Sequence, residues 1–219
     1  MKLGYSKQSI DHNDVKFVSK ILLSKFITQG PKVIEFENNV KKYVGSKYAY
    51  ATNSATSALH IACLSINLNK SDYILTSPIS FVASSNCALY CGAKTKFIDI
   101  DINTFNLCPL KIIEYINKKK KLGHQLPKAI VFVYLAGNPV DLSSLYKVCK
   151  VNKIYLIEDA SHAIGSIINK KKIGSCISSD ICVFSFHPVK NITTGEGGMA
   201  LTNNLILAKK LNIFRSHGI

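Results

Sequence analysis

Short apolar runs alternate with helical stretches along most of the chain, and no other feature constrains the fold as strongly. The runs are rich in Val, Ile and aromatic residues and lie at 48–52, 73–77, 95–100, 129–135, 154–160, 181–186 and 197–203. Strands that are apolar on both faces must be covered on both sides. The alternation therefore predicts an α/β fold with a mostly parallel sheet and helices on both of its faces.

Helical spacing of apolar residues occupies the segments between most of these strands and the N-terminal part of the chain. The clearest helices are predicted at 11–25, 32–44, 55–66 and 141–152. Asp11 is placed to cap the first of them and Gly45 to end the second. The chain has 219 residues, of which 47% are apolar, and contains no linker-like stretch or repeat. We therefore expect one sizeable domain with its own core.

The chain carries a large positive charge, +15 from 28 Lys and Arg against 13 Asp and Glu. Such a surplus favours an anionic partner such as nucleic acid, a membrane surface or a phosphorylated metabolite. The lysines are scattered, however, and the run Lys118–Lys121 follows a helical pattern that is typical of a solvated helix end. Because no nucleic-acid recognition motif accompanies the charge, we predict no nucleic-acid partner.

The seven cysteines are odd in number and form no C-x-x-C pair. This pattern is typical of buried, reduced thiols and not of a disulfide framework or a zinc site. The N-terminal residues show no apolar core of a signal peptide, and no apolar run has the length of a membrane span. We expect a cytoplasmic protein with no metal site and no membrane contact.

Ligands of parallel α/β proteins bind where the strands end, so the loops after the strands are the places to look for chemistry. After the first strand, "TNSATSALH" brings small residues and hydroxyls directly into a helix. Thr56 and Ser57, with the free N–H groups of that helix, are suited to cradle a phosphate, although an ordinary N-cap explains the same residues. After the second strand, Phe81 follows a proline turn, either as core packing or as a ring stacked on a flat ligand.

Two later strands end in ionisable residues. The fifth runs into "EDASHA", where Asp159 ends an apolar strand and His162 follows three residues later. A carboxylate in that place needs a cationic or hydrogen-bonding partner, unless it only caps a helix. The sixth leads through "SFHPVK" to Lys190, and desolvation there would lower its pKa as a nucleophilic lysine requires. A surface lysine with a buried stem is the alternative.

Together these residues supply what a pyridoxal 5'-phosphate (PLP) enzyme needs. Asp159 would pair with the protonated ring nitrogen, Phe81 would stack on the ring, and Lys190 would bind the aldehyde carbon and move protons. The remaining contacts are hydroxyls and one imidazole, with Thr56, Ser57 and Ser185 at the phosphate and His162 at the ring hydroxyl. A dinucleotide-binding fold is disfavoured because no G-x-G-x-x-G follows the first strand.

Longer stretches carry a resemblance to a known family. The segments "NSATSALHIA", "SPISFVASSNCALY", "YLAGNPVD", "IEDASHAIGS" and "FSFHPVKNITTGEGGMALTN" are similar, in content and order, to the DegT/DnrJ/EryC1/StrS family of sugar-nucleotide aminotransferases. The resemblance covers the whole chain and implies the PLP-dependent fold type I, with Lys190 carrying PLP and Asp159 holding its ring nitrogen. The implied substrate contacts fall on Tyr5, Lys25, Phe26, Ile27, Thr28, Ala55 and Ser185.

The resemblance also implies a reaction, the transfer of an amino group from L-glutamate to C4 of a UDP-4-keto-6-deoxy-N-acetylhexosamine in pseudaminic acid (nonulosonate) biosynthesis. Lys190 would shuttle the proton in both halves of this transfer. Because family members form homodimers, a homodimer is the expectation for a full-length protein. Two alternatives stay open, a family transaminase that acts on another sugar nucleotide and a truncated, non-catalytic remnant.

The length of the chain departs from the family pattern, because members are nearly twice as long. The resemblance implies that residues 31–219 form the PLP-binding large domain. Residues 1–30 would form an N-terminal helix and a segment on the substrate side. The family's C-terminal small domain is expected to be absent from this chain.

Overall fold

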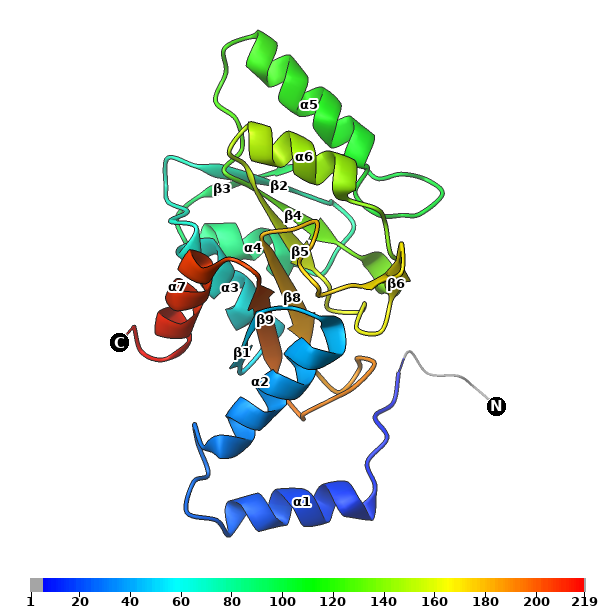
Figure 1. Ribbon diagram of the computed structural model, residues 1–219. Coiled ribbons are helices and arrows are strands. Elements are labelled where there is room, and N and C mark those ends of the chain that lie inside the picture. Colours follow the sequence, from blue (N-terminus) through cyan, green and yellow to red (C-terminus); the bar gives the residue numbers. More distant parts are fainter. Residues whose placement is uncertain (1–5, 219) are drawn as a thin grey trace.

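A seven-stranded sheet runs through the centre of the computed structural model, which describes residues 6–218 (Figure 1). The strand order is β1-β9-β8-β5-β4-β2-β3; β9 pairs antiparallel with β1 and β8, and the other neighbouring strands are parallel. The strands are β1 Tyr48–Thr52, β2 Tyr73–Thr76, β3 Lys94–Phe97, β4 Ala129–Val133, β5 Tyr155–Asp159, β8 Ile181–Ser185 and β9 Gly198–Thr202. The predicted mostly parallel sheet is confirmed, and each of its strands overlaps a run predicted from the sequence.

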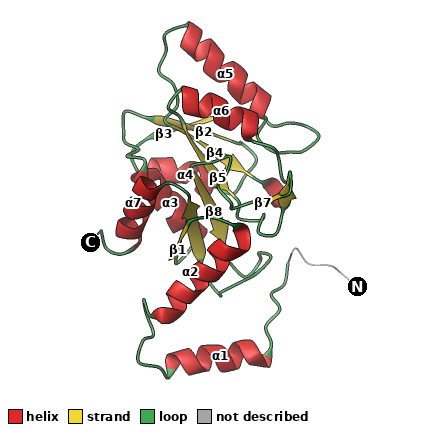
Figure 2. Ribbon diagram, in the orientation of Figure 1, coloured by secondary structure: helices red, strands yellow, loops and turns green. Residues whose placement is uncertain are grey.

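Helices cover both faces of the sheet, as predicted (Figure 2). One face packs against α2 (Pro31–Val44), α5 (Pro109–Lys121) and α6 (Ser143–Val151), and the other against α3 (Ala55–Ser65), α4 (Ala83–Leu89) and α7 (Leu205–Arg215). Alternate residues of a strand point to opposite faces, so Phe132 and Phe184 enter the first core while Val131 and Val183 enter the second. All four side chains are fully buried.

The N-terminal helix α1 (His12–Leu22) begins where its cap residue was predicted. The Asp11 carboxylate accepts the backbone N–H groups of Asn13 (2.7 Å) and Asp14 (3.0 Å), and the Asp14 carboxylate accepts the N–H of Asp11 in return. None of the helix residues is buried, and α1 lies apart from the sheet (Figure 1). The helix ends at Leu22, three residues before the predicted end at residue 25.

Several smaller features complete the fold. Gly45 ends α2 at φ 84°, a left-handed conformation that favours glycine, as predicted. The predicted strand at 129–135 ends at Val133, because the next residues form the short 3₁₀ helix η1 (Leu135–Gly137). A hairpin of β6 (Ile167–Ile168) and β7 (Lys171–Lys172) was not predicted. Six of the seven cysteines are buried, and in residues 6–218 no helix is long and apolar enough to cross a membrane.

Candidate active site

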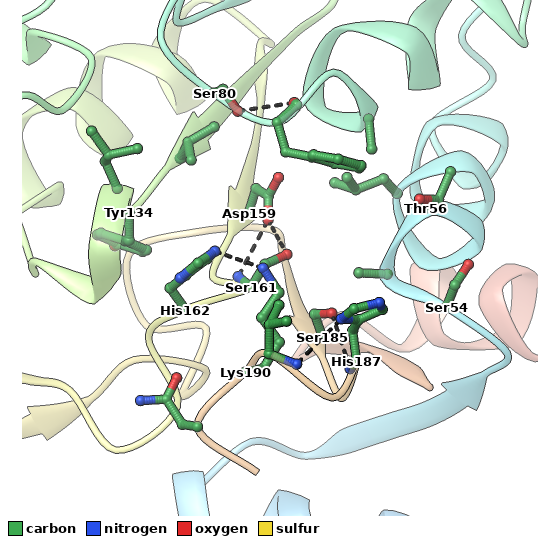
Figure 3. Close-up of a pocket in the computed structure, with 18 of the residues that line it drawn as sticks. Ser54, Thr56, Ser80, Tyr134, Asp159, Ser161, His162, Ser185, His187 and Lys190 are labelled. Carbon is green, nitrogen blue, oxygen red and sulfur yellow. Dashed lines mark hydrogen bonds between the residues drawn. The ribbon is translucent and has the colours of Figure 1, made fainter. Parts of the chain in front are cut away.

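A cavity of about 930 Å³ lies at the carboxyl ends of the parallel strands. Its walls come from the loops that follow β1, β2, β4, β5 and β8. Four of these loops were singled out for chemistry from the sequence, and the loop after β4 was not. Figure 3 shows Asp159, His162 and Lys190 directed toward one another inside it. The remaining predicted residues that line the cavity are Ala55, Thr56, Phe81 and Ser185.

The first turn of α3 forms one wall of the cavity through Ala55 and Thr56. Ser54 is the N-cap of this helix, and its Oγ accepts the backbone N–H of Ser57 at 3.1 Å. Ser57 does not line the cavity; its hydroxyl donates to Asn53 Oδ1 at 2.6 Å. The capping interpretation therefore holds for Ser54, while the positive end of the helix and the Thr56 hydroxyl remain suited to an anion.

A glycine allows β9 to approach the start of α3 closely. A Cβ added at Gly198 would lie 2.3 Å from the carbonyl carbon and oxygen of Ser54 and 2.4 Å from the backbone nitrogen of Ala55. The neighbouring strand β8 places Ser185 beside the same turn, and this serine is buried and lines the cavity. The helix start and two hydroxyls, Thr56 and Ser185, thus line the same cavity, where they are available to a bound phosphate.

Phe81 lies at the mouth of the cavity and is 73% exposed. The alternative that its ring packs in the core is wrong for the described residues. An exposed aromatic ring beside a polar cavity is instead available to stack on a flat ligand. The turn that presents the ring is closed by α4, whose first residues donate backbone N–H groups to the carbonyls of Phe81 and Val82.

Asp159 is almost completely buried, at 4% exposure, and its carboxylate accepts three hydrogen bonds. Ser161 donates its backbone N–H (3.2 Å) and its hydroxyl (2.6 Å) to Oδ1. Ser84 donates its hydroxyl to Oδ2 at 2.6 Å. The prediction that this carboxylate needs hydrogen-bonding partners is confirmed, although neither serine was foreseen.

Its neighbour Glu158 has a different environment, because consecutive residues of a strand point to opposite faces. Glu158 lies at a separate cavity of about 150 Å³ and accepts a hydrogen bond from the Tyr134 hydroxyl at 2.9 Å. Burial raises the pKa of Glu158, while the Tyr134 hydroxyl acts in the opposite direction. Of the two carboxyl groups in "EDASHA", Asp159 is the one at the larger cavity.

Lys190 lies half-buried in the cavity, with its Nζ 2.6 Å from His162 Nε2. Burial lowers the pKa of Lys190, and the nearby Asp159 carboxylate partly offsets this. The pKa of His162 is lowered by burial and by the Lys190 cation. The tautomer of the neutral His162 ring decides which of the two nitrogen atoms donates in this hydrogen bond. Desolvation thus acts on the pKa of Lys190 in the predicted direction.

The predicted substrate residues divide into three groups. Ala55 and Ser185 line the cavity. Tyr5 lies outside the described residues, although Ser6 lines the cavity. The other four are exposed in the connection between α1 and α2, away from the cavity lining: Lys25, Phe26, Ile27 and Thr28.

Two lining residues at the rim were not among the predicted site residues. His187 and Glu196 face each other there, with 3.8 Å between Nε2 and Oε1. The imidazole Nδ1 also accepts the backbone N–H of Val189 at 3.3 Å. His187 could have been predicted at this site because it lies in "SFHPVK", three residues before Lys190.

The arrangement can now be compared with known proteins. Residues 8–219 match the DegT/DnrJ/EryC1/StrS aminotransferase family, whose segments the sequence resembles. The chain belongs to this family. Its fold is that of the PLP-dependent, fold type I sugar aminotransferases among its structural neighbours.

Three DegT/DnrJ/EryC1/StrS relatives illustrate the similarity. The UDP-4-amino-4,6-dideoxy-N-acetyl-beta-L-altrosamine transaminase of Campylobacter jejuni strain 81-176 is 43% identical over 218 residues, 99% of this chain and 56% of the relative. Helicobacter pylori PseC, an aminotransferase involved in the biosynthesis of pseudoaminic acid, has a TM-score of 0.87 at 38% identity and covers 100% of this chain and 57% of its own. Spr1654 from Streptococcus pneumoniae, solved in a PLP form, has a TM-score of 0.86 at 27% identity over 97% of this chain and 57% of its own.

This member of the DegT/DnrJ/EryC1/StrS family spans just over half the length of the curated relatives that it matches. Family membership implies PLP, and the cavity fits that cofactor. The buried Asp159 accepts hydrogen bonds, Lys190 has a lowered pKa, and the α3 start is kept open by Gly198. Asp159 suits the pyridinium nitrogen of PLP, Lys190 its aldehyde and the α3 start its phosphate.

Proposed function

We propose that this protein provides the PLP-binding part of a sugar-nucleotide aminotransferase. The proposed reaction transfers an amino group from L-glutamate to C4 of a UDP-4-keto-6-deoxy-N-acetylhexosamine, in pseudaminic acid biosynthesis. The choice of sugar is supported by relatives from Campylobacter jejuni and Helicobacter pylori with the altrosamine transaminase name, at 39–43% identity. Within this proposal residues 31–219 are the large domain and residues 1–30 the N-terminal, substrate-side segment.

Each lining residue has a distinct task in the proposed reaction. Bound PLP supplies an aldehyde that accepts the amino group and a protonated ring that withdraws electrons. Asp159 accepts the hydrogen bond of the ring N–H, Phe81 covers the ring face, and Thr56 and Ser185 hold the phosphate. Lys190 Nζ takes the proton from Cα of glutamate and delivers a proton to C4 of the sugar.

One observation supports this proposal more than any other. Lys190 Nζ lies 2.6 Å from His162 Nε2, in the same cavity as the buried carboxylate of Asp159. A half-buried lysine whose pKa is lowered and whose hydrogen-bond partner is an uncharged imidazole is prepared both to attack an aldehyde and to exchange protons. A surface lysine would instead keep its amino group in water, without a buried carboxylate and an imidazole beside it.

The proposal is tested by following the amino group. The purified chain, saturated with PLP, is mixed with L-glutamate, and the loss of the bound-cofactor absorbance and the release of 2-oxoglutarate are measured together. The UDP-4-keto sugar is then added and the aminated product is identified by mass spectrometry. We expect stoichiometric 2-oxoglutarate and restoration of the absorbance by the sugar. Lys190→Ala should abolish both steps, whereas the exposed control Lys171→Ala should not.

Other outcomes distinguish the alternatives. Restoration by a different UDP- or TDP-linked keto sugar, and not by the proposed one, would identify a transaminase of the same family for another product. Cofactor binding without any response to glutamate would favour a remnant that does not catalyse the reaction. A homodimer is part of the proposal, and analytical ultracentrifugation should give twice the 24.1 kDa mass of the chain. The cytoplasmic location stays a prediction.

A further inference from the structure

Ser84 occupies a special place between two residues of the cavity. It is the second residue of α4 and is fully buried, at 0% exposure. Its hydroxyl donates to Asp159 Oδ2 at 2.6 Å, and its backbone N–H donates to the carbonyl of Phe81 at 3.2 Å. A single residue therefore joins the carboxylate on β5 to the turn that presents the exposed ring.

The two oxygens of Asp159 are held in different ways. Among residues 6–218, Oδ1 accepts only from Ser161, which lies two residues along the same chain segment. Oδ2 accepts from Ser84, which is 75 residues away in sequence and belongs to another element. The terminal torsion of an aspartate is broad, so a donor from one side alone leaves the carboxylate plane poorly fixed. Ser84 supplies a second, independent hydrogen bond that fixes the carboxylate plane.

The direction of the hydrogen bond follows from the chemistry of the groups. A serine hydroxyl has one proton, and an ionised carboxylate can only accept. The Ser84 proton therefore goes to Asp159. The Ser84 oxygen also lies 2.7 Å from Ser80 Oγ at the cavity wall, and the Ser80 hydroxyl is itself 3.1 Å from the Phe81 carbonyl, to which it donates. The hydroxyls of Ser80 and Ser84 and the carboxylate of Asp159 thus form one connected hydrogen-bond network.

We propose that Ser84 is a positioning residue that acts on the cofactor's ring nitrogen through Asp159. It holds the carboxylate turned into the cavity, and it ties this carboxylate to the turn of Phe81. This inference rests on the proposed function, because it assigns Asp159 to a pyridinium N–H. Ser84 is not expected to touch substrate or cofactor.

The test compares PLP with 1-deazapyridoxal phosphate, which has C–H in place of the ring nitrogen. Dissociation constants for both are measured on the 219-residue chain by absorbance and fluorescence titration. Ser84→Ala should raise the Kd for PLP about tenfold or more, as expected when a charged group loses a hydrogen bond. The Kd for the analogue should change less than about threefold, because it has no N–H for Asp159 to accept.

Matched variants separate positioning from folding. Ser85→Ala removes the next hydroxyl of the same helix, which bonds only the backbone carbonyl of Val82, and should leave both constants unchanged. Ser84→Thr retains the hydroxyl and should restore PLP binding at least in part. Ser84→Cys retains nearly the same volume with a weaker donor, so it should reproduce the ligand-selective loss even if the alanine variant fails to fold.

Three results would overturn the inference. Equal losses for PLP and the analogue would mean that Ser84 only supports the fold. Unchanged PLP binding in both Ser84→Ala and Ser84→Cys would mean that Asp159 needs no second donor. A wild-type chain that binds neither ligand at Lys190 would reject the proposed function, and the inference with it. A loss of PLP binding, and not of analogue binding, in the Ser84 variants supports the inference when the wild-type chain binds PLP at Lys190.

Discussion

Gly198→Ala tests whether the close approach of β9 to α3 builds the phosphate end of the cavity. The new methyl group would lie 2.3 Å from the Ser54 carbonyl, well inside van der Waals contact. Its neighbours are backbone atoms at the start of a helix and have no rotamer to change. Overpacking of this kind costs about 1–3 kcal/mol. For a domain of this size, that cost lowers Tm by about 2–4 °C per kcal/mol.

Gly197→Ala is the matched control for this prediction. A Cβ there would lie 2.2 Å from Thr194 Oγ1, which is the end of a side chain that can rotate away. Neither glycine has a positive φ, so the comparison isolates the identity of the obstructing atom. We expect the alanine at 198 to cost at least about 1 kcal/mol more than the alanine at 197, measured as the free energy of unfolding in urea.

The same pair of variants predicts a difference in ligand binding. A displaced α3 start withdraws its N–H groups, so Gly198→Ala should also weaken binding of PLP about tenfold or more, the equivalent of about 1.4 kcal/mol. Pyridoxal without its phosphate should be affected much less. Equal stability of the two variants, or equal losses for phosphorylated and unphosphorylated ligand, would refute the assignment of this end of the cavity.

Three further predictions concern ionisable groups. Burial raises the pKa of Glu158, so the folded protein keeps a proton at pH values where the unfolded chain has released it. The free energy of unfolding should therefore fall as pH rises from about 4.3, the unfolded value, toward the folded pKa. Glu158→Gln should reduce this pH dependence, measured by urea unfolding across that range. Glu37→Ala should cost about 2–4 kcal/mol of unfolding free energy, because it removes a buried carboxylate that accepts the Ala51 N–H, whereas Glu35→Ala, in an exposed pair, should cost under about 1 kcal/mol. Because burial lowers the pKa of Lys190, modification by an aldehyde and borohydride at neutral pH should favour Lys190 over Lys171, and equal labelling would contradict that lowering.

Much of the fold could be predicted because its strands are apolar at consecutive positions. The strand β4 contributes Phe132 to one core and Val131 to the other, so both of its faces had to be covered. Parallel strands then place their carboxyl ends at one edge, which is why Asp159 and Lys190 were predicted to meet there. At these positions the sequence pattern alone was enough to predict a mostly parallel sheet covered on both faces.

The remaining features depend on tertiary contacts that leave no local pattern. Nothing in "FVASSN" distinguishes Ser84 from Ser85, and only the packing of α4 against β2, β3 and β4 turns one hydroxyl toward Asp159. The exposure of Phe81 depends in the same way on how its turn is oriented. The segment 25–28 was predicted from resemblance alone, and within the described residues it does not line the cavity.

The central claim is that the cavity binds PLP through Lys190. The most direct test is an absorbance spectrum of the purified chain with PLP, followed by borohydride reduction, proteolysis and peptide mass mapping. We predict a bound-cofactor band and a pyridoxyl group on Lys190 at nearly one per chain. Absence of the group from this residue, or its spread over exposed lysines such as Lys171, would contradict the assignment of this cavity.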